Sequence, residues 1–307
     1  MTQRKITIIG SMNMDMVVEA PRFPNGGETI IGNKISFIPG GKGANQAVAV
    51  ARLGAPTTMI GAVGEDAFGQ TLMDSLKETG VDVHYIKQSQ TVSTGTASIT
   101  LVPDENTIVV VPGANHELKA DDIEKLESVI SESDIILLQL EIPLETVEAA
   151  VDVAFKHHKT LILNPAPAQE LPTELLKKID YITPNESELE TLTQMNRSEY
   201  SLDEMMDELL DKGIRCVITT LALGADGVAW KQKDEQVRQI SSHQVSVVDT
   251  TGAGDAFNGA LAYFLSQGNS VEQAVSFANQ VSALAVTKFG AQGGMPTLEA
   301  VKEYFRE

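Results

Sequence analysis

The chain has 307 residues and a formal net charge of −19, with 42 acidic against 23 basic side chains. No basic run interrupts this acidic character, which argues against nucleic acid as a partner because phosphate contacts need clustered lysine and arginine. The single cysteine, Cys216, excludes an intramolecular disulfide and lies in an apolar run typical of a buried side chain. No apolar run is long enough for a membrane span or a signal peptide, so we expect a cytoplasmic protein without a membrane partner.

Short runs of Ile, Leu and Val alternate with helical patterns, which is typical of parallel strands covered on both faces. We predict strands at residues 6–9, 58–60, 135–140, 161–163, 181–182 and 216–219. The helix beginning near Ala44 is apolar almost all round and should be buried, and further helices are predicted at 69–79 and 144–156. In the last of these, Val147, Val151 and Phe155 share one face. The alternation predicts one α/β domain, residues 1–307, whose mainly parallel central sheet is flanked by helices.

Two segments break this rhythm. In residues 28–38 apolar and polar side chains alternate as they do in a strand. Residues 93–111 are typical of two strands around a turn at 103–106. We predict a small antiparallel β lid formed by insertions at about 13–38 and 92–111. The lid would cover the carboxyl edge of the parallel strands, where open α/β sheets bind ligands. An extension of the main sheet edge is the alternative. A lid would also need an exposed apolar face that a partner subunit can cover.

Asn13 and Asp15 directly follow the first predicted strand and are two residues apart, so they face the same side of an extended segment. An amide and a carboxylate on one face form a clamp for vicinal hydroxyl groups, and Glu141 follows another strand at the same edge. The alternative is a polar strand end without a ligand.

A glycine-rich stretch, residues 39–46, opens the buried helix and contains Lys42 and Asn45. Its spacing is neither that of a P-loop nor that of a dinucleotide-binding fingerprint. The glycines allow close approach of the backbone to a small polar ligand. A flexible loop before the helix is the alternative.

Asn185 and Glu188 are three residues apart at a predicted helix start. A carboxylate and an amide there can hold a hydrated Mg²⁺, and they can equally form a capping pair. The five histidines show no metal-ligand spacing, and we expect them at the surface.

Residues 249–259 are the most informative stretch of the chain. A predicted strand at 245–248 leads into a turn with Gly252 and Gly254, and a helical pattern begins at Ala256. Glycine-exposed N–H groups and the positive end of a helix together form an anion hole. Asp255 at its lip either accepts a proton from a hydroxyl group or caps the helix. The helix dipole should keep its carboxylate ionised.

With these motifs in the same order and separation, the chain resembles the PfkB family of sugar kinases over essentially its whole length. The early family signature matches residues 40–47 and the late one matches residues 249–259. The resemblance implies transfer of the γ-phosphoryl group of ATP to the 5-hydroxyl of D-ribose. Asp255 matches the catalytic base, and Gly252, Ala253 and Gly254 match the anion hole. The sugar-contacting positions of the family match Asn13, Asp15, Gly41, Lys42, Asn45, Glu141 and Asp255.

The resemblance also implies cofactor sites. ATP contacts would come from Asn185, Thr220, Gly224, Gly227, Gly254 and Asn279. Asn185 and Glu188 match a motif tied to Mg²⁺ and phosphate through water. A potassium ion would be bound by Asp249, Thr251, Ala285, Lys288, Gly290 and Gly294. The family's lid often forms a homodimer interface.

One segment departs from the family pattern, because two residues are inserted near Ala222, before the first glycine of the nucleotide segment. The insertion puts in question whether the residues near Thr220 make the family's contacts to adenine. The alternatives are another kinase of this family, acting on fructose, a nucleoside or a sugar acid, and a non-catalytic sugar-binding protein.

Overall fold

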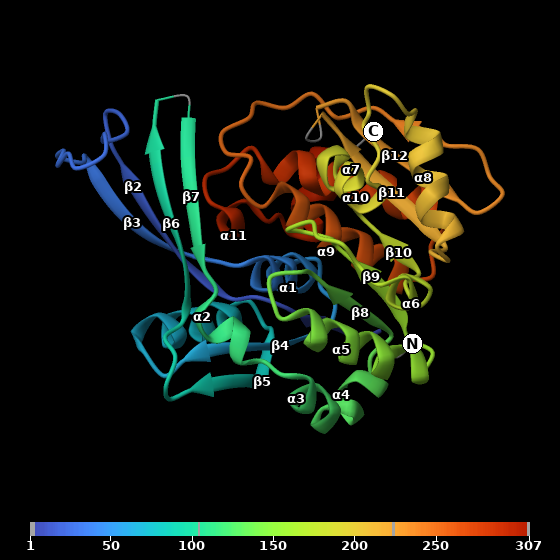
Figure 1. Ribbon diagram of the computed structural model, residues 1–307, viewed down its shortest axis with the longest axis horizontal. Coiled ribbons are helices and arrows are strands. Elements are labelled where there is room, and N and C mark those ends of the chain that lie inside the picture. Colours follow the sequence, from blue (N-terminus) through green and yellow to red (C-terminus); the bar gives the residue numbers. More distant parts are fainter. Residues whose placement is uncertain (1–3, 104, 223–224, 306–307) are drawn as a thin grey trace.

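The computed structural model describes residues 4–103, 105–222 and 225–305. Its central sheet has nine strands in the order β13-β12-β11-β10-β9-β8-β1-β4-β5. The strands from β11 to β5 are parallel, and only β12 and β13 run antiparallel to their neighbours (Figure 1). The predicted α/β fold with a mainly parallel sheet is therefore confirmed.

All six predicted strands of this sheet are present, and the sheet also contains three that were not predicted. The strands are β1 (Ile6–Ile9), β4 (Thr57–Gly64), β5 (Asp82–Ser89), β8 (Ile135–Leu138), β9 (Thr160–Leu163), β10 (Tyr181–Ile182), β11 (Cys216–Leu221), β12 (Gly227–Gln232) and β13 (Arg238–Ile240). Strands β5 and β13 form the two edges of the sheet. Their partly exposed residues give no continuous apolar run, which explains why the sequence pattern missed them.

Helices cover both faces of the sheet, and each layer has its own apolar core. One layer contains α1 (Lys42–Arg52), α2 (Ala67–Glu78), α9 (Ala253–Ser266), α10 (Val271–Ala285), α11 (Ala291–Gly294) and α12 (Leu298–Tyr304). The other contains α3 (Ala120–Lys125), α4 (Glu127–Ser131), α5 (Leu144–Lys156), α6 (Thr173–Leu176), α7 (Glu186–Thr193) and α8 (Leu202–Asp211), with a 3₁₀ turn η1 (Gly113–Glu117). Alternate residues of β8 face the two cores, which is why its sequence is apolar without interruption.

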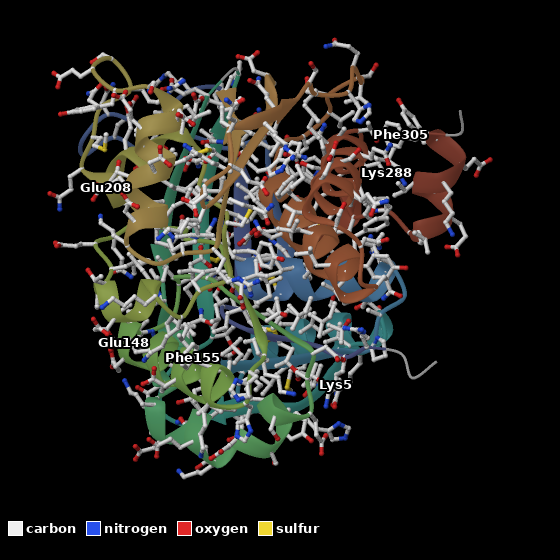
Figure 2. The ribbon with its side chains drawn as sticks, turned by 90° about the vertical axis from the view of Figure 1, so that its right-hand side faces the viewer. Lys5, Glu148, Phe155, Glu208, Lys288 and Phe305 are labelled. Atoms are coloured by element: carbon white, nitrogen blue, oxygen red, sulfur yellow. The ribbon has the colours of Figure 1, made fainter. Side chains whose placement is uncertain are left out.

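The predicted helices are confirmed, with small differences at their ends. Helix α2 begins at Ala67, two residues earlier than expected, because the Asp66 side chain caps it by accepting a hydrogen bond from Gly69 N at 2.9 Å. Helix α5 has the predicted bounds, and Val147 and Val151 are buried. Phe155, however, is 53% exposed and borders a surface pocket in the last turn of α5 (Figure 2).

A second sheet of four strands lies outside the main one, so the alternative of an edge extension was wrong. Its strands are β2 (Asn13–Glu19), β3 (Lys34–Gly40), β6 (Gly95–Val102) and β7 (Glu105–Val111), in the order β3-β2-β6-β7. The outer pairs are antiparallel as predicted, whereas β2 and β6 in the middle are parallel. Between these two strands the chain passes through β3, α1, β4, α2 and β5, and this long connection allows the parallel pairing. Residues 28–33, predicted as strand, form a loop.

The second sheet carries an unusual number of exposed apolar side chains. They come from β3 and from the edge strand β7: Ile35, Phe37, Ile108, Val109, Val110 and Val111.

The strand predicted at 245–248 is absent. Val247 and Val248 are each 62% exposed, and the backbone N–H of Val248 bonds to Val286 O at 2.8 Å rather than to a neighbouring strand. Cys216 is buried as expected, and burial raises the pKa of its thiol to about 12. Within the described ranges, no helix is both long and apolar enough to cross a membrane.

Candidate active site

The candidate site lies where the carboxyl ends of β1 and β8 meet the N-termini of α1 and α9. The chain adds β4 and β5 on one side of β1 and then returns to add β8 on its other side, so the strand order reverses between β1 and β8 and opens a crevice at their carboxyl ends. Residues 11–15 follow β1, and Glu141 follows β8. Lys42 and Asp255 lie in the first turns of α1 and α9. Positions far apart in the sequence are thereby brought together as expected.

Asp255 is buried, and amide groups from α1 bind both of its carboxylate oxygens. Asn45 Nδ2 donates to Oδ2 at 2.9 Å, and Gln46 Nε2 donates to Oδ1 at 3.0 Å. Helix α9 begins at Ala253, three residues earlier than predicted, and Gly252 is its N-cap. The interpretation of Asp255 as the N-cap was therefore wrong. Its side chain binds a neighbouring helix and faces the crevice instead.

Burial raises the pKa of Asp255, while the Lys42 ammonium group and the hydrogen bonds from Asn45 and Gln46 oppose this rise. The helix dipole alone led us to expect a carboxylate held firmly ionised, and burial acts in the opposite direction. A carboxylate with a raised pKa is better matched to accepting a proton near neutral pH.

Three other charged groups surround this carboxylate. Burial raises the pKa of Asp15 to about 7, and the charges of Glu141 and Asp255 add to this shift. Glu141 accepts hydrogen bonds from Ser11 Oγ and, at 3.4 Å, from Lys42 N. Burial lowers the pKa of Lys42, but nearby carboxylates, Asp255 first among them, raise it overall. The cluster therefore holds several carboxylates against one ammonium group, which favours hydroxyl donors as ligands.

Asn13 is held in one orientation by Asn115, a residue that the sequence analysis did not identify. Asn115 Nδ2 donates to Asn13 Oδ1 at 2.8 Å and to Pro112 O at 2.9 Å, while Asn115 Oδ1 accepts from Met12 N at 2.8 Å. The bond to Oδ1 leaves Asn13 Nδ2 available as a donor. Asn115 thus joins the start of β2 to the segment that leaves β7.

Close contacts explain why two positions of this region are occupied by glycine. Gly41 has φ of 89°, and a Cβ there would lie 2.6 Å from Asn13 N. Gly40 pairs with Asn13 across β2 and β3, and a Cβ on it would overlap the Asp15 carboxylate. The glycine-rich stretch therefore packs against the Asn13–Asp15 segment, and the alternative of a flexible loop was wrong.

Some buried polar atoms at and behind the site lack a protein partner in the described part of the chain, Asn45 Oδ1 and Gln139 Oε1 among them. Asn45 Oδ1 is buried and has no hydrogen-bond partner among the described residues. A buried acceptor without a donor costs about 1–3 kcal/mol. A hydroxyl group of a bound ligand would supply the missing donor.

The turn before α9 leaves amide groups and space for an anion. Gly252 has φ of 79° and positions the first turn of the helix. No atom lies within 4 Å of a Cβ built on Gly254, so the space beside it is open. Ala253 N donates to Thr250 O at 3.2 Å, whereas Gly252 N and Gly254 N donate to no carbonyl in the described backbone. Of the three predicted anion-hole amides, Ala253 is therefore already engaged.

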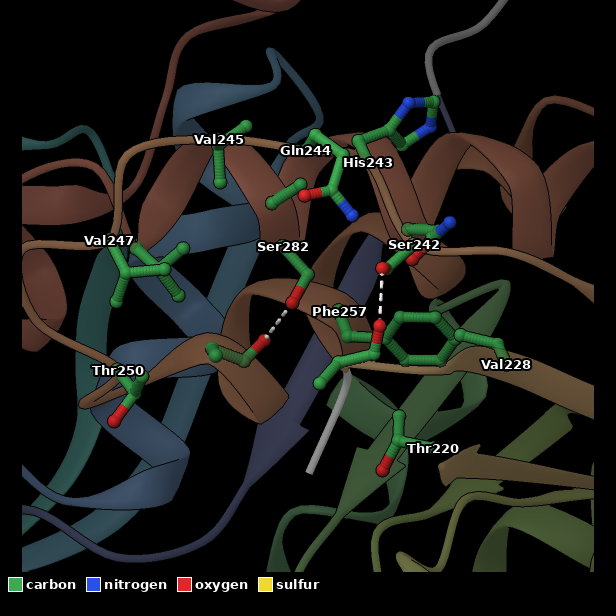
Figure 3. Close-up of a pocket in the computed structure, with 15 residues that line it drawn as sticks. Thr220, Val228, Ser242, His243, Gln244, Val245, Val247, Thr250, Phe257 and Ser282 are labelled. Atoms are coloured by element: carbon green, nitrogen blue, oxygen red, sulfur yellow. Dashed lines mark hydrogen bonds between the residues drawn. The ribbon is translucent and has the colours of Figure 1, made fainter. Parts of the chain in front are cut away.

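A cavity of about 270 Å³ opens beside this turn and extends toward β11 and β12 (Figure 3). Thr220 and Asn279, predicted as nucleotide contacts, both line it. Gly227 begins β12 with φ of 91° and lies against Ile240 O, outside the lining. Gly224 falls outside the described residues. His243 also lines the cavity and is half-buried there.

Asn185 and Glu188 form the capping box of α7. Glu188 N donates to Asn185 Oδ1, and Asn185 N donates to Glu188 Oε2, each at 2.9 Å. The capping interpretation is confirmed. Burial raises the pKa of Glu188, while the hydrogen bond from Asn185 N and the charge of Lys42 oppose this rise. Mg²⁺ binds through one or two carboxylates and keeps several waters, and the second oxygen of Glu188 suits this role.

The residues proposed for potassium also lie together. The Asp249 carboxylate accepts from Thr251 N at 2.9 Å and from Gly290 N at 2.8 Å. A Cβ on Gly294 would overlap Ala285 O, and Lys288 N donates to that same carbonyl at 3.4 Å. Carboxylate, hydroxyl and carbonyl oxygens are suitable ligands for a monovalent cation. This set of oxygens fits the ion.

Comparison with known proteins agrees with this geometry. The profile of the pfkB family carbohydrate kinases matches residues 3–298. A ribokinase of Bacillus subtilis is 42% identical over 98% of this chain and 99% of its own, and a ribokinase of Lactococcus lactis is 41% identical over 99% and 97%. The structure of an Arabidopsis thaliana ribokinase complexed with ribose and ATP is similar, with a TM-score of 0.91, 34% identity and 100% coverage of both chains. The chain belongs to the pfkB family of carbohydrate kinases.

Proposed function

We propose that this protein transfers the γ-phosphoryl group of ATP to the 5-hydroxyl of D-ribose, giving D-ribose 5-phosphate and ADP. The observation that carries the proposal is the buried Asp255 carboxylate between a cluster of hydroxyl-binding groups and a helix N-terminus with open space beside it. Ribokinases are among the relatives that match over nearly their full length, as are two deoxyribokinases of Salmonella, and the similar Arabidopsis thaliana ribokinase structure contains ribose and ATP.

The sugar lies, in this proposal, between β2 and the first turn of α1. Asn13, Asp15 and Glu141 bind its hydroxyl groups, and Asn45 Oδ1 gains the donor that it lacks in the free protein. Gly41 and Lys42 complete the site. Two carboxylates repel an acidic substrate, which favours an uncharged sugar.

Asp255 acts as the base in this proposal. It accepts the proton of the 5-hydroxyl while the amides of Gly252 and Gly254 stabilise the charge that develops on the transferred group. Ala253, whose N–H is engaged, helps to shape the turn.

The nucleotide occupies the cavity beside α9. We propose contacts from Asn185, Thr220, Gly224, Gly227, Gly254 and Asn279. Mg²⁺, held through water by Asn185 and Glu188, would neutralise charge on the nucleotide phosphates. The two-residue insertion predicted near Ala222 directly follows β11, whose Thr220 lines this cavity.

A potassium ion at Asp249, Thr251, Ala285, Lys288, Gly290 and Gly294 would hold the turn that carries the anion hole. We further propose a cytoplasmic homodimer in which the exposed apolar side chains of β3 and β7 meet those of a second copy. The second sheet, spanning insertions at about 13–38 and 92–111, then acts as both lid and interface.

A coupled assay of ADP release over a panel of sugars, with and without K⁺, tests this proposal. We expect ADP release with D-ribose, stimulated by K⁺, and much less with 2-deoxyribose, fructose or nucleosides. Preference for one of the other sugars would assign a different kinase activity. The absence of turnover with every sugar would support a non-catalytic binding protein.

A further inference from the structure

Behind Asp255 lies a chain of buried amide side chains. Gln46 and Gln139 are both 0% exposed. Gln139 Nε2 donates to Gln46 Oε1 at 2.6 Å, and Gln46 Nε2 donates to Asp255 Oδ1 at 3.0 Å. Gln46 Nε2 also bonds to Asn164 Oδ1 at 3.2 Å. The chain runs from the end of β8 through α1 to the first turn of α9.

These contacts fix which way the Gln46 amide points. Its oxygen faces a donor, and its nitrogen faces two acceptor oxygens. A rotated amide would place its oxygen against the Asp255 carboxylate and its nitrogen against the Gln139 NH₂ group. Gly10 leaves the room that Gln139 needs, since a Cβ there would overlap Gln139 Oε1. The Gln46 amide is therefore held by three direct partners, of which Gln139 alone satisfies its oxygen, while Gln139 Oε1 has no partner among the described residues.

The two oxygens of Asp255 differ in their surroundings. Oδ2 is bonded to Asn45, whose own Oδ1 lacks a partner in the free protein. Oδ1 is bonded to Gln46, which has no exposed surface. Because Gln46 is fully buried, we expect a ligand at Asn45 to approach Oδ2 rather than Oδ1. The Gln46 bond is thus the one that can persist while substrate binds.

We propose that Gln46, oriented by Gln139, is a positioning residue that anchors Asp255 through Oδ1 and directs Oδ2 toward the sugar hydroxyl. The inference rests on the proposed kinase activity and assigns a role within it. Loss of the anchor lets the carboxylate rotate away from the hydroxyl, which lowers turnover more than substrate affinity.

The test uses Gln46→Met and Gln139→Met, which preserve an unbranched side chain but remove the amide. For Gln46→Met we expect kcat to fall roughly 10- to 100-fold, as for loss of one hydrogen bond to a charged group, with KM for ribose and ATP changed less than about threefold. Gln139→Met should lower kcat by a smaller factor, because it acts through Gln46. The double variant should have the same kcat as Gln46→Met alone, because Gln139 acts only through Gln46.

Thr7→Val is the matched control for loss of a buried hydrogen bond. Thr7 Oγ1 bonds Ser133 Oγ at 2.7 Å, and both residues are buried away from the site. This variant should lower Tm and leave kcat unchanged.

If Gln46→Met does not fold, Gln139→Met alone must still lower kcat at constant KM. Normal kcat in a folded variant, or additive effects in the double variant, would overturn the positioning role. An inactive wild-type protein would instead overturn the proposed function.

Discussion

Replacing Asp15 by asparagine should stabilise the free protein while weakening its affinity for the sugar. In the structure Asp15 is half-buried, and its pKa is raised from 3.8 to about 7 by burial and by the charges of Glu141 and Asp255. Among the described residues, no side chain donates a hydrogen bond to its carboxylate. The ionised form is therefore destabilised in the folded state, as expected for a group held ready for a ligand.

The sign and size of the stability change caused by Asp15→Asn follow from proton linkage. Because the folded-state pKa lies above the unfolded value, the folded protein binds more protons between about pH 4 and 7, and its stability falls as the pH rises through that window. The shift of about three units corresponds to about 4 kcal/mol at pH 8, at 1.36 kcal/mol per unit. At pH 5, where Asp15 is largely protonated in the folded state, about 2 kcal/mol of the difference remains. These values are upper limits, because water screens a half-buried carboxylate.

The assay is urea unfolding at pH 5, 6, 7 and 8, followed by the fluorescence of Trp230, the only tryptophan, which is 3% exposed in β12. The stabilising effect of Asp15→Asn should grow with pH. Asp66→Asn is the control of opposite sign, since hydrogen bonds from Thr94 and Gly69 outweigh burial and lower the pKa of Asp66. This control should be destabilised by a similar amount at all four pH values, because the stability linked to a lowered pKa is lost only below the unfolded value of 3.8. A stability difference for Asp15→Asn that is independent of pH, or that shrinks as pH rises, would refute the reasoning.

The remaining predictions concern turnover and affinity. Asp255→Ala should lower kcat by several orders of magnitude while ribose still binds by calorimetry; near-normal turnover would remove Asp255 from the role of base. Gly254→Val should fold, because the space beside Gly254 is open, yet it should lower kcat more than it weakens sugar affinity. Gly252→Val should lower Tm instead, because φ is 79° and its Cβ would lie 2.8 Å from that of Ala291; equal thermal stability of the two variants would contradict this contrast. Asn115→Ala should raise the Kd for ribose roughly tenfold with kcat nearly kept, and an unchanged Kd would show that Asn13 needs no such support.

The fold was largely predictable from sequence because both faces of the parallel strands are buried. Such strands appear as uninterrupted apolar runs, whereas the partly exposed edge strand β5 does not. The start of α9 was misplaced because Gly252, Ala253 and Gly254 offer no apolar periodicity, although Gly252 already sets the first turn. The valines at 245–248 resembled a strand but lie in an exposed loop.

The site was predictable where the spacing of neighbouring residues determines which side chains share a face, as for Asn13 and Asp15 on one strand. It was not predictable where function depends on distant partners. Asn115 reaches Asn13 across 102 positions, and Gln46 reaches Asp255 across 209. No local pattern marks such pairs. Gln46 follows Asn45 directly in the glycine-rich stretch, and that adjacency was the only available signal.

Phosphorus NMR of the product tests the central claim most directly. Purified protein incubated with D-ribose, ATP, Mg²⁺ and K⁺ should convert the γ-phosphoryl signal of ATP into that of a monoester coupled to the protons on C5 of ribose, and the Asp255→Ala sample should retain its ATP. A phosphate at C1, free inorganic phosphate alone, or unchanged ATP in the wild-type sample would contradict the account.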